Sequence, residues 1–158
     1  LITFEGIISN SVDIPPTTQA SLGQFDTTGT SAATLAAVSS GFILDVFQSA
    51  PDAGMVTFTG TLTGSLAATN SQAFVLFDAP LSASIVGAIF TTTYEIIEAD
   101  EGVLGRANLV PPSVNNGVSS VEAEISISVI PEPATVAMAG LGLPFGLMVL
   151  RRRARKGR

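Results

Sequence analysis

The chain contains no histidine, cysteine or tryptophan, and its first 150 residues contain no lysine. A Ser-His-Asp or Cys-His relay needs an imidazole base, and zinc is bound mostly through histidine and cysteine. Schiff-base and phosphate-loop chemistry need a lysine, and no glycine-rich phosphate loop leads into a helix. Arg106 is the one cation before residue 151 that could stabilise developing negative charge. Since these absences remove most enzyme mechanisms, we expect a protein that is not an enzyme and holds no cofactor.

Positive charge is almost absent from residues 1–130. This stretch carries twelve acidic residues and one base, Arg106, so its net charge is −11. The formal charge of −6 for the whole chain averages this acidic stretch with a cationic C-terminus. Because an acidic surface repels polyphosphate, we expect no nucleic-acid partner. The lack of cysteine leaves the redox compartment open, since about 130 residues can bury a core without disulfides.

One long hydrophobic run occurs, close to the C-terminus. Residues 134–150 are uncharged, and the hydroxyl of Thr135 is their only side-chain polar group. As a helix, this run would reach about 26 Å, the short end of a membrane span. Six of the seven cationic side chains of the chain follow at once: Arg151, Arg152, Arg153, Arg155, Lys156 and Arg158. Because such a basic block stays on the cytoplasmic side, we predict a transmembrane helix over 134–150 with the preceding residues outside.

The hydrophobic run is preceded by Pro131-Glu132-Pro133. Pro133 suits the first turn of a helix, where its missing N–H costs nothing. Each proline also biases the residue before it toward extended geometry. The junction is therefore predicted to be a stiff, extended peptide beside the bilayer, a form that proteases and transpeptidases accept, with Glu132 as a charge for recognition. Glu132 can equally be a favourable acid at a helix N-terminus, and both interpretations can hold together.

The motif at 131–133, the short hydrophobic helix and the terminal arginine cluster together resemble the sorting signal of bacterial PEP-CTERM proteins. The resemblance covers only the last 28 residues. It implies that a membrane-embedded exosortase, a transpeptidase, processes the chain near Pro131, Glu132 and Pro133. It further implies membrane lipid and exopolysaccharide as partners. An ordinary single-pass anchor with Pro-Glu-Pro at its outer edge is the alternative.

The same resemblance implies a route for the protein. The chain would pass through the inner membrane with its body in the periplasm and then reach the cell surface or the extracellular matrix. Such a route needs an N-terminal signal peptide. Since none is visible at Leu1, we expect further sequence before it.

Residues 1–129 are predicted to form an extracytoplasmic all-β domain, followed by the sorting signal at 130–158. Their composition is rich in Thr, Ser, Val, Ile and Phe and is broken by Gly, Pro and Asn. In 55–63 the apolar Val56, Phe58 and Leu62 share one face and threonines occupy the other. The stretch 121–129 alternates in the same way, and we expect its apolar members in the core: Val121, Ala123, Ile125, Ile127 and Val129. One wet and one buried face indicate an antiparallel sheet.

The strands are predicted over 2–9, 41–48, 55–63, 72–77, 85–98 and 121–129. About seven short strands are typical of an antiparallel β-sandwich of the jelly-roll or immunoglobulin-like type, with a barrel-like variant as the alternative. Residues 31–39 remain open between a short helix and a strand, because alanine favours helix while the neighbours favour strand.

The densest group of acids is Glu95, Glu98, Asp100 and Glu101. Of these, Glu98, Asp100 and Glu101 are candidate calcium ligands, since carboxylate oxygens are what this cation prefers. A solvated turn after a strand explains the same residues, and their spacing fits no known calcium loop, so we expect no metal site. A glycosidase pair drawn from these acids is disfavoured, because only Tyr94 is available to stack on a sugar.

The sequence therefore predicts a non-enzymatic exported surface or extracellular-matrix protein, delivered by a PEP-CTERM-like tail. A membrane-anchored ligand-binding module for a glycan or for calcium is the alternative. The tail carries the first hypothesis, and the acids and strands of the body leave the second one open.

Overall fold

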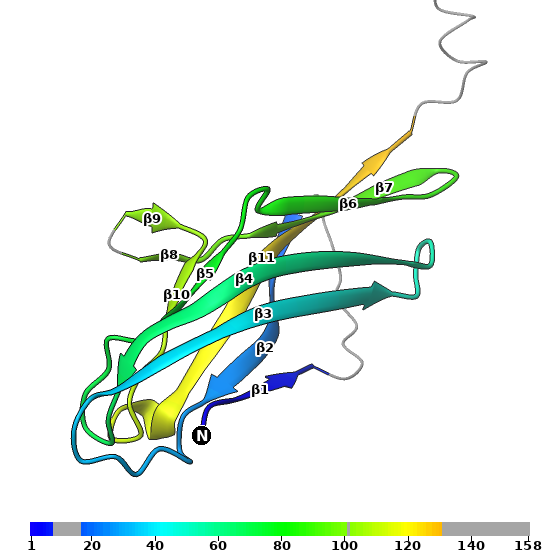
Figure 1. Ribbon diagram of the computed structural model, residues 1–158. Helices are drawn as coiled ribbons and strands as arrows, with labels where there is room; N and C mark the ends of the chain where they lie inside the picture. The colour runs from blue at the N-terminus through cyan, green and yellow to red at the C-terminus, as the bar shows by residue number, and fades with distance from the viewer. Residues whose placement is uncertain (8–16, 101, 131–158) are drawn as a thin grey trace, which may run out of the picture. The chain divides into compact units, whose positions relative to one another are not determined.

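The computed structural model describes residues 1–7, 17–100 and 102–130 of the chain. These residues form two antiparallel sheets that face each other as in a β-sandwich, which confirms the predicted all-β class, and no α-helix occurs among them (Figure 1). The first sheet has the order β1 (Thr3–Gly6), β2 (Thr17–Asp26), β11 (Val118–Val129), β7 (Phe90–Ile96) and β6 (Ser82–Val86). The second has the order β10 (Arg106–Asn108), β5 (Phe74–Phe77), β4 (Gly54–Leu66) and β3 (Ala36–Gln48). A ribbon of β8 (Ala99–Asp100) and β9 (Val103–Leu104) and a 3₁₀ turn, η1 (Asn115–Gly117), complete the described elements.

The predicted alternation is confirmed in β4 and in most of β11. In β4 Val56 and Phe58 are buried while Thr57, Thr59 and Thr61 are exposed. In β11 Val121, Ala123 and Ile125 are buried.

The prediction is wrong at the end of β11, where Ile127 is half-buried and Val129 is 65% exposed. The physical reason lies in the pairing with β2, whose last pair is Ser126↔Thr17. Beyond this pair the described residues before β11 supply no β2 backbone beside the strand, and its apolar side chains are covered less.

The core lies between the two sheets and contains an aromatic cluster that bridges them. Phe4 and Phe25 come from the first sheet, and Phe42 and Phe77 from the second. Their ring centroids lie 4.9 to 5.8 Å apart in tilted and edge-to-face arrangements, each such pair contributing about 0.5–1.5 kcal/mol beyond area burial. Phe47 departs from this pattern, since it is 76% exposed.

One predicted strand needs correction, one open choice is decided, and one strand was not predicted. The predicted strand 85–98 is a hairpin of β6 and β7, because a turn closed by a Gly87 N–H to Phe90 O bond of 2.8 Å separates them. Residues 31–39 contain no helix, since 36–39 belong to β3 and pair with 63–66 of β4. The strand β2 is not predicted at all, although it lies next to β11 in the middle of its sheet.

The contacts divide the chain into two units, Leu1–Ser128 and Val129–Arg158. Every residue of the buried core cluster belongs to the first unit, so we expect this body to fold without the tail. No helix among the described residues is long and apolar enough to cross a membrane. The predicted transmembrane helix at 134–150 lies outside the described residues.

Candidate functional site

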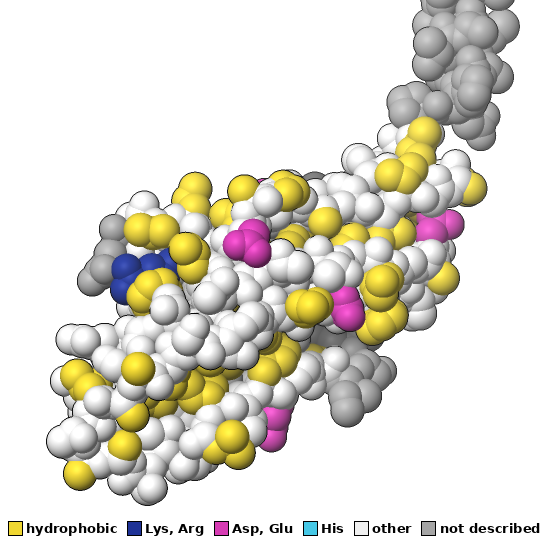
Figure 2. All heavy atoms as spheres, viewed as in Figure 1, with side chains coloured by type: hydrophobic (Ala, Val, Ile, Leu, Met, Phe, Trp, Pro, Cys, Tyr) yellow, Lys and Arg dark blue, Asp and Glu magenta, His cyan; other side chains and the backbone are white. Residues whose placement is uncertain are grey.

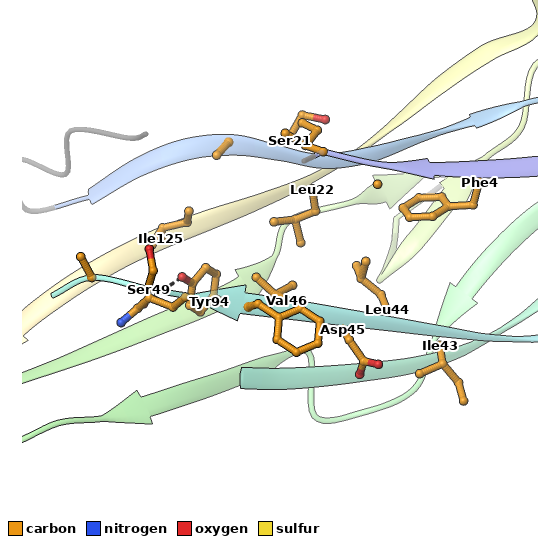
Figure 3. Close-up of a pocket in the computed structure, with 16 residues that line it drawn as sticks. Phe4, Ser21, Leu22, Ile43, Leu44, Asp45, Val46, Ser49, Tyr94 and Ile125 are labelled. Atoms are coloured by element: carbon orange, nitrogen blue, oxygen red, sulfur yellow. Dashed lines mark hydrogen bonds between the residues drawn. The ribbon is translucent and has the colours of Figure 1, made fainter. Parts of the chain in front are cut away.

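A groove of about 640 Å³, lined by both apolar and polar residues, opens between the two sheets, where β3 faces β1 and β2 (Figure 3). Phe4 and Leu22 line it from the first sheet, and Leu44 and Val46 line it from β3. Figure 3 shows Leu44 and Val46 pointing toward Leu22, while Ile43 and Asp45 point away from the groove. The volume falls within the range of sites that bind small molecules.

The groove exists because the facing edges of the two sheets differ in length. β1 has 4 residues and pairs only with 23–26 of β2, whereas β3 has 13 residues. The part of β2 before Gly23 therefore has no strand beside it on that side among the described residues. The side chain of Leu22 consequently lines the groove and is not covered by a neighbouring strand.

A second hollow of about 550 Å³ lies along the other half of β3, where Leu62 and Leu66 help to line it. The contact between the rings of Phe4 and Phe42, whose centroids are 5.1 Å apart, lies between the two hollows. The inner face of β3 thus borders a hollow toward each of its ends.

Most polar side chains at the groove are already bonded within the protein. The Tyr94 hydroxyl donates to Gln48 Oε1 at 2.9 Å, and Gln48 Nε2 donates to Asp52 O at 2.6 Å. Burial raises the pKa of Tyr94, so its hydroxyl stays a neutral donor. Ser21 Oγ donates to Gly23 O at 3.2 Å. The lining thus offers apolar contact and no nucleophile paired with a base.

The candidate calcium ligands do not converge in the described part of the chain. Glu98 is half-buried, and its Oε1 accepts the Glu122 N–H at 2.8 Å. Burial raises the pKa of Glu98. The hydrogen bond from the Glu122 N–H lowers this pKa, and the negative charge of Glu122 raises it further. Glu101 lies outside the described residues. Within the described ranges no three potential metal-ligating side chains come together.

Asp100 is engaged by the only cation of the body. Arg106 Nε lies 3.6 Å from Asp100 Oδ2, an ion pair that is too long for a hydrogen bond. The same Nε donates to Asn108 Oδ1 at 3.2 Å, and the guanidinium lies 4.2 Å from the ring centroid of Phe74. Asp100 and Arg106 therefore form a structural link between β8 and β10.

The predicted processing motif, Pro131, Glu132 and Pro133, lies outside the described residues, and so does the predicted basic block 151–158. The groove residues were missed at the sequence level, because Leu22 belongs to the strand that was not predicted. A signal was present in 41–48, where apolar residues occupy both faces of one strand. Such a strand indicates contact on two sides.

Comparison with known proteins assigns no family to this arrangement. No protein-family model matches the chain, and no curated protein or solved structure matches it significantly. The features of the chain that bear on its function are the groove, the strand edges and the sequence of the tail.

Proposed function

We propose that this chain is a non-enzymatic protein of the cell surface or extracellular matrix, delivered by a PEP-CTERM-like sorting signal that an exosortase processes. The observation that carries the proposal is the three-part sequence of the tail: the motif 131–133, the apolar run 134–150 and the basic block 151–158. The finer assignment of the fold, a jelly-roll or immunoglobulin-like sandwich followed by one transmembrane helix, is part of this proposal.

Each part of the tail has a physical task. The apolar run is long enough to hold the chain in a thin bilayer at about 26 Å. The basic block stays cytoplasmic and keeps the acidic body on the other side. The two prolines hold the peptide around Glu132 extended, so that a transpeptidase in the membrane can reach it.

The body supports a non-catalytic role. Its core is self-contained within Leu1–Ser128. The half-buried Glu98 is bound by a backbone N–H, and Asp100 is paired with Arg106. The groove between the sheets is lined by apolar side chains and internally bonded polar groups. Such an arrangement suits display and contact rather than chemistry.

The substitution Glu132→Ala tests the sorting role. It should block maturation and leave membrane insertion intact, because insertion depends on the apolar run and the basic block. If Glu132 serves only as an acid at a helix start, the change removes at most about 1 kcal/mol and processing continues. Mass spectrometry of the exported form, in a host that carries the cognate exosortase, distinguishes the two.

The matched control is Glu95→Ala, which removes an exposed acid from the body and should be processed like the wild type. A wild-type protein recovered with Arg158 still attached would reject the sorting role. It would leave a plain single-pass anchor.

The groove of about 640 Å³ favours a second candidate, the membrane-anchored ligand-binding module, and of its two ligands it favours a glycan, since the described residues bring no set of calcium ligands together. The two functions predict different responses to ligand, since a ligand that binds only the folded state raises the melting temperature. A titration of the body with calcium and with oligosaccharides, followed by thermal melting, separates them. A clear rise favours the binding module, and an unchanged melting temperature favours the display protein.

A further inference from the structure

β3 presents the longest open strand edge of the two sheets within the described residues. The strands at the sheet edges are β1, β6, β10 and β3, with 4, 5, 3 and 13 residues. β3 pairs with β4 without interruption from Ala36↔Leu66 to Gln48↔Gly54. On its other side the described residues supply no strand, so a row of backbone N–H and C=O groups faces outward.

This edge lacks the features that keep strands from pairing with other chains. Natural edges are short, or they carry lysine, proline or a bulge. β3 contains none of these residues, and its register shows no bulge. Asp45 is its only charge, although residues 1–130 carry a net charge of −11. The edge is thus a charge-poor strip on an acidic body, where a second acidic body meets the least repulsion.

The outer face of β3 is exposed and carries two large apolar side chains. Ile43 is 67% exposed and Phe47 is 76% exposed. Met55 of β4, which pairs with Phe47, is 53% exposed. Figure 2 shows apolar side chains on either side of an acidic one over β3. Single exposed apolar residues are common, but a group at an unpaired edge marks an interaction surface.

The sequence of β3 is complementary to itself. In an antiparallel pair with Phe42 on the two-fold axis, all 13 residues of both strands are paired. On the outer face Ile43 then meets Gly41, Phe47 meets Ala37, and Asp45 meets Ser39. Each large side chain faces a small one, and Gly41 leaves open space beside it. Moving the register by two residues in either direction leaves residues unpaired and breaks this match.

The charges fit the same register. Asp45 Oδ1 accepts the Thr57 hydroxyl at 2.6 Å within its own chain, so the other oxygen can accept the Ser39 hydroxyl of a second copy. The two Asp45 residues lie six residues apart along the paired strands, roughly 20 Å. This exceeds the screening length of about 8 Å at physiological salt, so they repel each other little.

We propose that two copies of this chain associate by antiparallel pairing of their β3 strands around Phe42. Their four-stranded sheets then join into one sheet of eight strands, in which the β3 edge of each copy is paired. The proposal is independent of the tail and of the sorting role, since it rests on residues of the body alone.

Disulfide trapping tests the register, because the chain contains no cysteine. Ser39→Cys and Asp45→Cys are prepared separately in residues 1–130, mixed and oxidised. We expect a cross-linked dimer with one chain of each kind, identified by intact mass, since facing residues have Cα atoms about 4.5–5.5 Å apart. Each variant alone should not cross-link, because its two cysteines would lie roughly 20 Å apart. Equal cross-linking in the mixed and separate samples would overturn the proposal.

Sedimentation equilibrium tests the edge itself. Ile43→Lys places a charge beside the two-fold axis and should weaken the dimer at least about tenfold, because lysine blocks edge pairing. The control is Val86→Lys, a 71% exposed residue on the β6 edge, which should leave the dimer as in the wild type. Both side chains are exposed, so thermal melting should verify that both variants fold.

Two results would reject the dimer. One is a wild-type body that stays monomeric up to about 1 mM, which leaves the edge to a different partner. The other is a dimer that Ile43→Lys leaves unchanged, which places the interface elsewhere.

Discussion

At the scale of single residues, Ile125 and Ile127 share one face of β11 but differ in environment. Ile125 is 5% exposed, whereas Ile127 is half-buried beyond the last pair with β2. Ile125→Asp should therefore cost at least about 3 kcal/mol of unfolding free energy, because it buries an unpaired charge. Ile127→Asp should cost about 1 kcal/mol, because its carboxylate can reach water. Urea unfolding of residues 1–130 measures both. Equal losses for the two variants would show that the burial pattern of β11 is wrong.

The single residue Glu98 should make the stability of residues 1–130 depend on pH. Burial raises the pKa of Glu98 above the ordinary 4.5, so the folded state binds the proton more tightly than the unfolded state. As pH rises from 4.5 through the folded pKa, the contribution of Glu98 to stability should fall, and above this window it should stay constant. Glu98→Gln can still accept the Glu122 N–H but has no proton to lose. Unfolding at several pH values should show that the wild type loses stability relative to Glu98→Gln across the window. Parallel pH profiles would contradict this assignment.

At the scale of elements, period-two patterns predicted those strands whose two faces meet different environments. β4 and most of β11 have one wet and one buried face, so their side chains alternate. β2 has no such pattern, because the register with β11 shifts between Val121 and Glu122. A shift of this kind exchanges the two faces in the middle of the strand. The inward-facing residues of β2 before the shift are also small, so neither the periodicity nor the hydrophobicity of the sequence predicts this strand.

Contacts between elements also explain the other differences between the predicted and the observed strands. The start of β3 is rich in alanine and serine, which favour strands weakly, and its pairing with β4 imposes the extended form. The apolar run around Gly87 conceals the turn between β6 and β7. The groove depends on the unequal lengths of β1 and β3, a relation between distant segments that local patterns do not contain.

At the scale of the whole molecule, charge is divided between the body and the tail. Residues 1–130 carry −11, and residues 131–158 carry six cations and Glu132, a net of +5. Each cation at the centre of a bilayer costs about 2.5–3.5 kcal/mol, so the basic block should remain in the cytoplasm. A reporter fused after Arg158 should be active there, and replacing the arginines with glutamine should weaken this orientation. A reporter that is active only in the periplasm would contradict the topology.

The position of Arg106 affects how susceptible residues 1–130 are to proteases. Enzymes that cut after lysine or arginine find a single target in residues 1–130, and it is Arg106. This side chain is paired with Asp100, lies over the ring of Phe74, and stands at the start of β10, which pairs with β5. Cleavage after Arg106 therefore requires local opening of a sheet edge, because a protease needs the target chain extended and free. We therefore expect residues 1–130 to resist trypsin-like proteases while folded, although they contain no disulfide.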